Sequence, residues 1–171
     1  SLAAYSAGRL VGAWVDLEGK DAEEVTAEAI AAMRPMIADW MSAAEAFDEL
    51  WVFDHENIAP LVDGECGVSE AVEAAAILET VEDHEIDSFR AWIANGEDAD
   101  VDTYRDRYLG NFDTLEDYAS QYAEDTEMLN SIPENLRAYF DMEAFARDLE
   151  LGGDIYSVPD GSGGVFVFSN Y

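Results

Sequence analysis

The chain has 171 residues and a mass of 18.8 kDa, and its 39 Asp and Glu residues against 8 Lys and Arg residues leave a formal net charge of -31. Apolar residues make up 49% of the chain and aromatic residues 12%, which is too much for the class of acidic proteins that stays disordered. The length excludes a large multidomain enzyme, and the charge opposes binding to nucleic acid or to anionic lipid.

The first part of the chain is predicted to contain short strands. Residues 9–16 carry Leu, Val and Trp around a single glycine, which is typical of a strand that follows a turn. Residues 2–5 are the predicted hairpin partner, and residues 50–53 are a further strand candidate. Between these strands, Asp21 and Glu24 have the spacing of a capping box and predict a helix that Pro35 ends.

The middle of the chain is predicted to be helical. Ser69 is expected to cap a helix whose apolar residues recur in steps of three, and the same pattern from Ile86 onward predicts a second helix that Asn95 and Gly96 end. A third helix is predicted over residues 104–109.

The last third is predicted to combine helices with a closing hairpin. Asp113 and Glu116 have capping-box spacing ahead of one helix, and a further helix is expected to start at residues 132–133. Asp141 is expected to cap the last helix, which the glycines at 152–153 end. Val158 and residues 165–168, joined by a Pro- and Gly-rich loop, predict a hairpin.

Metal sites are poorly supported by the residue spacing. Asp98, Asp100 and Asp102 resemble the start of a calcium loop. However, Thr103 stands where such a loop needs Gly and Leu109 where it needs the bidentate Glu, so a solvated acidic turn is favoured over a calcium site.

The two histidines and the single cysteine do not form a recognisable reactive site. His84 lies in an acidic run with no second His one helical turn away, so favourable interaction of these acids with a helix N-terminus is the preferred interpretation. Asp54, His55 and Glu56 are consecutive, and neighbouring side chains in extended backbone point in opposite directions. Cys66 is alone, which excludes an intrachain disulfide and fits a reducing compartment. The chain is therefore predicted to be neither an enzyme nor dependent on a cofactor or metal.

The negative charge is spread along the whole chain. Residues 1–60 carry a net charge of -9, and residues 61–107 and 108–171 carry -11 each. Because no acidic tail is present, the field belongs to the folded surface, and such a surface can occupy the basic groove of a DNA-binding protein. Three alternatives remain open, namely a cation-binding structural protein, an acidic protein that binds basic partners, and a salt-adapted or merely soluble acidic protein. No apolar run long enough for a membrane span and no secretory signal is visible, so a cytoplasmic location is expected.

The chain resembles the ArdA family of antirestriction proteins in specific residues near both ends. The N-terminal residues that carry the resemblance are Ala4, Tyr5, Gly8, Arg9, Gly12, Trp14, Asp16 and Leu17, with Asp54, His55 and Glu56. The C-terminal ones are Gly110, Asn111, Phe112, Asp113, Thr114, Leu115, Glu116, Asp117, Tyr118 and Ala119, then Ile132, Pro133, Glu134, Leu136, Tyr139, Asp141, Glu143, Phe145, Ala146, Arg147, Asp148 and Leu149, then Gly153, Asp154, Val165, Val167, Phe168 and Asn170.

The resemblance implies an α+β fold drawn out into an elongated, curved chain of three small modules. These are an N-terminal sheet with a helix (1–60), a central acidic helical bundle (61–107) and a C-terminal module of helices with a small sheet (108–171). It also implies a homodimer that mimics bent duplex DNA. Such a dimer blocks type I restriction-modification enzymes at the DNA groove of their methyltransferase core.

Two sets of residues are predicted to carry this function. The acidic surface that would contact the partner consists of Glu70, Glu73, Glu79, Glu82, Asp83, Glu85, Asp87, Glu97, Asp98, Asp100, Asp102, Asp113, Glu116, Asp117, Glu124, Asp125 and Glu127. A segment similar to the family's antirestriction motif contains Leu129, Ile132, Pro133, Leu136, Tyr139, Phe140 and Asp141. Because its apolar residues have the spacing of a buried face, a role in folding or in a dimer contact is favoured for this segment.

Overall fold

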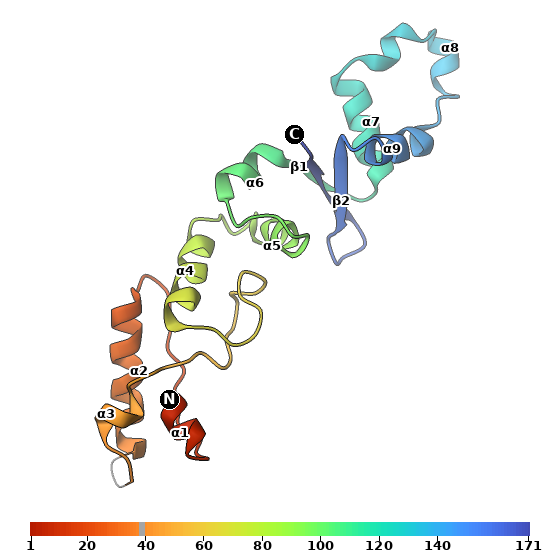
Figure 1. The fold of residues 1–171 in the computed structure, drawn as a ribbon. Coiled ribbons are helices and arrows are strands. Elements are labelled where there is room, and N and C mark those ends of the chain that lie inside the picture. Colours follow the sequence, from red (N-terminus) through yellow and green to blue (C-terminus); the bar gives the residue numbers. More distant parts are fainter. Residues whose placement is uncertain (38–39) are drawn as a thin grey trace. The chain divides into compact units, whose positions relative to one another are not determined.

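The structure is a computed structural model that describes residues 1–37 and 40–171 (Figure 1). The chain divides into two compact units, Ser1–Glu82 (unit 1) and Asp83–Tyr171 (unit 2), which are described separately. Unit 1 contains helices, and unit 2 combines helices with a small antiparallel sheet. This mixture confirms the predicted α+β class, while the division into three modules stays a prediction.

The described residues of unit 1 form four helices around two small cores. The helices are α1 (Leu2–Ser6), α2 (Ala22–Ile37), α3 (Ala43–Ala46) and α4 (Val68–Glu79). Ala4, Met33 and Ile37 belong to the first core, where α1, α2 and α3 meet. The second core lies against α4 and contains mostly small or β-branched side chains, which are Ile58, Val62, Cys66, Ala71 and Ala74. Each core is small, so neither excludes much apolar surface from water by itself.

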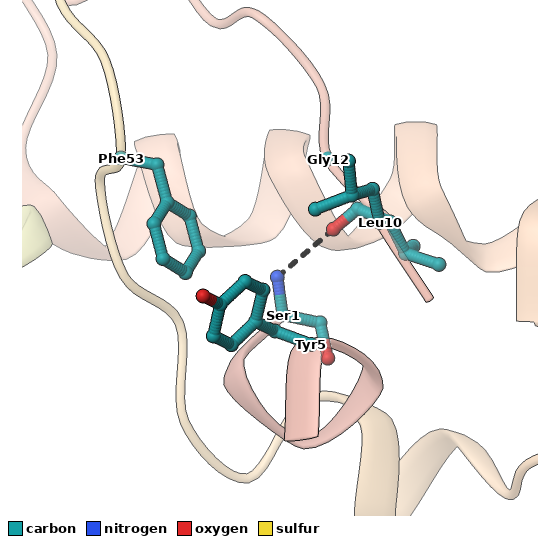
Figure 2. Close-up of a pocket in the computed structure, with 6 residues that line it drawn as sticks. Ser1, Tyr5, Leu10, Gly12 and Phe53 are labelled. Atoms are coloured by element: carbon teal, nitrogen blue, oxygen red, sulfur yellow. Dashed lines mark hydrogen bonds between the residues drawn. The ribbon is translucent and has the colours of Figure 1, made fainter. Parts of the chain in front are cut away.

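The predicted N-terminal sheet is wrong for the described residues. Residues 2–5 lie in α1, because the Ser1 side chain accepts a hydrogen bond from the Ala4 amide and the following Ala-rich residues favour a helix. Residues 9–16 place Val11 in the first core without entering a strand ladder. In residues 50–53, Val52 forms only an isolated bridge to Cys66. Both segments are rich in apolar residues, but among the described residues neither pairs with another segment in a strand ladder (Figure 2).

The start of α2 follows the prediction and its end does not. The Glu24 amide donates to Asp21 Oδ1 at 2.8 Å and the Asp21 amide donates to Glu24 Oε2 at 3.1 Å, which confirms the capping box. Pro35 lies inside α2, which continues to Ile37. The burial of Met33 and Ile37, only 3% and 2% exposed, offsets the hydrogen bond that proline removes. The predicted cap of α4 is also wrong, because Gly67 is the N-cap and Ser69 lies within the helix.

Unit 2 is organised around a three-stranded antiparallel sheet in the order β1-β3-β2. Its strands are β1 (Tyr108–Phe112), β2 (Ile155–Pro159) and β3 (Val165–Ser169), and β2 with β3 forms the predicted hairpin. The helical segments are α5 (Ile86–Ala94), α6 (Val101–Arg107), α7 (Leu115–Asp125), η1 (Met128–Ser131), α8 (Glu134–Arg137) and α9 (Met142–Leu151).

Strand β1 occupies part of the segment that was predicted to be a helix over residues 104–109. Helix α6 ends at Arg107, and Tyr108 is already extended. The pairing of β1 with β3 shifts its register between Tyr108 and Gly110, and Gly110 has φ 136. A β-bulge of this kind interrupts the alternation of side chains, which explains why the sequence pattern did not indicate a strand.

Strand β3 is covered on both faces. Phe168 contacts the rings of Trp92 and Tyr104, with centroids 5.5 Å and 6.4 Å away, so α5 and α6 cover one face. Val167 points to the opposite face and shares a core with Tyr118 and Ile155, where α7 and α9 pack. Residues on both sides of the predicted 107/108 module boundary therefore share one aromatic core.

The remaining helix ends of unit 2 agree with the sequence in part. Asp141 caps α9, Gly152 follows its last residue, and Asn95 is the C-cap of α5, all as predicted. The cap of α7 is Thr114 rather than Asp113, since the Asp117 amide donates to Thr114 Oγ1 at 3.1 Å.

Strand β2 lies at the edge of the sheet, and a side chain occupies a backbone donor on its outer side. Glu150 Oε1 accepts hydrogen bonds from the Ser157 amide at 3.1 Å and from the Ser157 hydroxyl at 2.6 Å. Pro159, at the end of the same strand, has no amide hydrogen to offer.

Candidate partner-binding surface

The acids predicted to contact a partner are mostly at the surface. Fifteen of the seventeen are exposed, and the two exceptions, Glu85 and Glu97, are half-buried. Glu70, Glu73, Glu79 and Glu82 belong to unit 1 and the others to unit 2. The structure thus distributes the predicted surface over both units.

Helix α4 separates its acids from its core side chains. Ala71 and Ala74 are buried in the second core of unit 1, whereas Glu70 and Glu73 are exposed. Glu79 accepts a hydrogen bond from the Gly19 amide at 2.8 Å, so this carboxylate also ties the chain before α2 to the end of α4. Because the small side chains sit against the core, the acids are carried on the outer side of the helix.

Helix α7 repeats this arrangement in unit 2. Tyr118, Ala119 and Ala123 are buried, and the acids around them are exposed. These exposed acids are Asp113, Glu116, Asp117, Glu124, Asp125 and Glu127. Asp117 accepts a hydrogen bond from the Thr114 hydroxyl at 2.6 Å, which fixes it at the start of the helix, where the helix dipole favours negative charge.

The acidic turn before α6 has a structural role. Asp100 Oδ1 accepts a hydrogen bond from the Thr103 amide at 2.7 Å and is the N-cap of α6. Hydrogen bonds from Thr103 hold the pKa of the Asp100 carboxyl below its usual value. Residues 1–37 and 40–171 contain no group of three or more His, Cys, Asp or Glu side chains arranged to hold a metal ion.

The two half-buried acids are engaged within unit 2. Glu85 receives the Arg105 guanidinium through two nitrogens, with Nη2 at 2.7 Å and Nε at 3.1 Å from its carboxylate oxygens. Glu97 Oε1 accepts a hydrogen bond from the Tyr156 hydroxyl at 3.3 Å. Burial, together with the nearby Glu97 carboxylate, raises the pKa of Tyr156 above its usual value. We therefore assign Glu85 and Glu97 a stabilising role in addition to their charge.

Basic residues cannot neutralise this surface. Lys20 pairs with Glu28 at 2.6 Å, and Arg147 lies 3.9 Å from Asp148. Even if each of the 8 Lys and Arg residues paired with one acid, 31 acids would keep their charge. Exposed pairs of this kind also contribute only about 0 to 1 kcal/mol each, so they do little to offset the repulsion among the acids.

The antirestriction-like segment lies between α7 and α9 and is largely exposed. Leu136 is 49% exposed and Tyr139 is 84% exposed, so the predicted buried face is wrong for these two residues. The physical reason is that α8 has only four residues and none of them is buried. Leu129, Ile132 and Phe140 are half-buried, Pro133 is exposed, and Asp141 caps α9. Arg137 Nε donates a hydrogen bond to the Ile132 carbonyl at 3.1 Å, which stabilises the turn of the chain between these two residues.

Two contributors to this surface, Thr114 and Tyr156, and the partner of Arg105 were not predicted from the sequence. Thr114 supplies the cap of α7, and the spacing of Thr114 and Asp117 was a detectable signal for it. Arg105 and Tyr156 hold Glu85 and Glu97 across 20 and 59 residues, respectively. Contacts over such distances have no local signal in a single sequence.

The family comparison agrees with the resemblance noted in the sequence. The model of the family described as "Antirestriction protein (ArdA)" matches residues 1–163, which include all of unit 1, most of unit 2 and the whole antirestriction-like segment. The chain belongs to the ArdA family of antirestriction proteins. No individual curated protein matches the chain significantly.

Membership of the ArdA family gives this chain an antirestriction function directed at restriction-modification enzymes. Members of the ArdA family are inhibitors rather than enzymes. Within the residues that the structure describes, every helix is too short or too polar to span a bilayer.

Proposed function

We propose that this ArdA protein is a mimic of bent duplex DNA that occupies the DNA groove of type I restriction-modification enzymes, at their methyltransferase core. The observation that carries the proposal is the formal charge of -31, part of which lies on exposed acids of helices α4 and α7, whose inner faces hold the buried residues. Binding is competitive with DNA and involves no chemical step.

The size of the charge fits this role. Duplex DNA carries one negative charge per about 1.7 Å of its axis, so 31 charges correspond to at most roughly 50 Å of duplex. A basic groove filled by these carboxylates gains the same release of counterions that it gains with DNA. The inhibitor needs no base-specific contact, because backbone phosphates supply most of the non-specific affinity of DNA-binding proteins.

Fixed positions of the acids support the same role. Asp100 and Asp117 are held by hydrogen bonds at helix starts, and Glu70 and Glu73 lie on a helix whose inner side is packed. Charges that are already ordered lose less conformational entropy on binding than charges on mobile side chains or tails. An ordered array of anions therefore competes better with DNA than a disordered acidic segment of equal charge.

The antirestriction-like segment is proposed to form a homodimer contact. Its exposed Leu136 and Tyr139 are three residues apart in a unit whose sheet core is already complete without them. A second copy would cover these side chains and would double the number of anions available to one partner. The proposal also places the protein in the cytoplasm, where restriction-modification enzymes act.

Competition with DNA tests the proposal. A type I methyltransferase bound to labelled duplex should release the DNA when this protein is added, and the apparent dissociation constant should rise steeply with salt. Replacing Glu116, Glu124 and Glu127 together by Gln should weaken the competition and reduce its salt dependence. Replacing the same three residues by Asp keeps the charge and serves as the control. Absence of competition at low salt would contradict the proposal.

A further inference from the structure

Helix α5 begins without the side-chain cap that α6, α7 and α9 have. Asp100, Thr114 and Asp141 each accept a backbone hydrogen bond at the start of α6, α7 and α9, respectively. The N-cap of α5 is Glu85, whose side chain accepts no hydrogen bond of this kind. Short side chains with an oxygen, those of Ser, Thr, Asp and Asn, are the ones that cap a helix start well. The first turn of α5 therefore needs another source of order.

Arg105 supplies this order from the neighbouring helix α6. Its Nη2 lies 2.7 Å and its Nε 3.1 Å from the Glu85 carboxylate oxygens, and binding through two nitrogens fixes orientation as well as distance. Only 15% of the Glu85 side chain is exposed, against 39% of the Arg105 side chain, so solvent screens this pair less than a fully exposed one. A buried hydrogen bond of 2.6 Å between the Ser88 and Tyr104 hydroxyls joins the same two helices, which are neighbours in unit 2 (Figure 1).

Exposed acids flank both members of this bridge. Asp83 and Asp87 lie two residues to either side of Glu85. Asp102 lies in the first turn of α6, three residues before Arg105. All three acids belong to the surface that is proposed to contact the partner, and their mutual repulsion acts to separate the two helix starts. The bridge between Arg105 and Glu85 opposes this separation.

We propose that Arg105 is a positioning residue of the partner-binding surface, which acts through Glu85 to hold the acids at the starts of α5 and α6 in the arrangement that the basic partner binds. The inference rests on the proposed function, because it concerns the same acids and the same partner. A basic groove repels Arg105, so the number of charges alone predicts tighter binding without it. A positioning role predicts the opposite, because acids that are no longer fixed lose more conformational entropy on binding.

The DNA competition assay distinguishes these opposite expectations. Arg105→Gln removes one positive charge together with the bridge to Glu85. Arg147→Gln removes one positive charge from a loose pair, in which Arg147 lies 3.9 Å from Asp148 and both side chains are mostly exposed. We expect Arg105→Gln to weaken competition about fivefold, and Arg147→Gln to leave it equal or slightly tighter.

A double-mutant cycle tests whether Arg105 acts through Glu85. In a Glu85→Gln background the bridge is already lost, so Arg105→Gln should cause no further weakening of competition. All affinities are measured at a temperature at which circular dichroism shows each variant to be folded, so that unfolding does not lower the concentration of competent inhibitor.

Each other outcome has a distinct meaning. If the wild-type protein fails to displace DNA at low salt, the proposed function itself is wrong. If the wild-type protein competes and Arg105→Gln competes equally well or better, the positioning role is overturned, and a fall in melting temperature alone would then assign the bridge to stability. An equal loss of affinity in Arg147→Gln, or a full loss on adding Arg105→Gln to Glu85→Gln, would overturn it as well, because the effect would not depend on the bridge.

Discussion

The two units of this protein reach stability by different means. Unit 2 is centred on β3, whose Phe168 and Val167 are fully buried between two helical layers. The buried residues of unit 1's two small cores are mostly small or aliphatic, with Trp40 and Phe47 only partly buried against the first core, and Tyr5, Trp14 and Phe53 are exposed. Both units carry a similar negative charge and therefore a similar repulsion among their acids. A concentrated aromatic core opposes this repulsion in unit 2, whereas smaller, scattered contacts oppose it in unit 1.

The largest expected effect is on the aromatic core of unit 2. Phe168→Ala should reduce the free energy of unfolding of unit 2 by about 3 to 5 kcal/mol, because it removes a fully buried ring that contacts Trp92, Tyr104 and Tyr156. Denaturant titration measures the change, with Trp92 as the only tryptophan in unit 2.

Ile37→Ala in unit 1 and Ile155→Ala in unit 2 form a matched pair, because both remove the same atoms from side chains that are 2% and 5% exposed. Each should cost about 2 to 5 kcal/mol, with the larger loss at Ile155 in the concentrated core of unit 2. Equal losses would contradict the contrast between the two cores.

A smaller effect is expected at the start of α7. Thr114→Ala should lower stability by about 0.5 to 2 kcal/mol, since the Asp117 amide loses its hydrogen-bond acceptor at the N-cap. Asp113→Ala is the control, because Asp113 does not cap this helix and should change stability little. Thermal unfolding monitored by circular dichroism measures both, and equal losses would favour the cap that the sequence predicted.

The smallest effect is expected at Asp160, whose exposed carboxylate is screened by solvent. Hydrogen bonds from the Ser162 amide, Asn111 and the Ser162 hydroxyl hold the pKa of Asp160 well below its usual value. A lowered pKa in the folded state means that the stabilisation is complete above the unfolded pKa of about 3.9 and is lost as the pH falls toward the folded pKa.

Asp160→Asn tests this contribution. The variant should be less stable than the wild-type protein at neutral pH and should lose less stability between neutral and acidic pH. Melting temperatures of both proteins from pH 7 down to about 3 measure the difference. Parallel pH profiles would show that Asp160 makes no linked contribution to folding.

Local signals in the sequence predicted the elements that local interactions define. The capping box at Asp21, the cap at Asp141 and the β2-β3 hairpin depend on residues close in the chain, and each is present. Strand β1 and helix α1 were not predicted. The bulge at β1 disturbs the alternation that indicates a strand, and α1 is fixed by Ser1, which caps it and donates its amino group to the Val11 carbonyl at 3.0 Å.

The acidic character of the candidate surface could be predicted from the sequence, but the contacts and exposure of its individual residues could be predicted only in part. Acids such as Glu73 and Glu116 are exposed as expected, because a charged side chain on an amphipathic helix avoids the core. The engagement of Glu85 by Arg105 depends on a tertiary contact that spacing does not reveal. The exposure of Leu136 and Tyr139 was not predicted either, because an apolar pattern alone does not reveal that a helix is too short to be covered.

The occupied backbone donor on the outer edge of β2 matters because the protein is strongly charged. Like-charge repulsion keeps copies of this protein apart in dilute buffer, but concentrated salt screens that repulsion and acid removes it. Under those conditions an open strand edge would invite sheet-to-sheet aggregation. Glu150 accepts the hydrogen bond of the Ser157 amide, and Pro159 has no amide hydrogen. This edge therefore offers few donors to an incoming strand. At this edge of the sheet the protein thus has a safeguard against strand pairing that high salt does not remove.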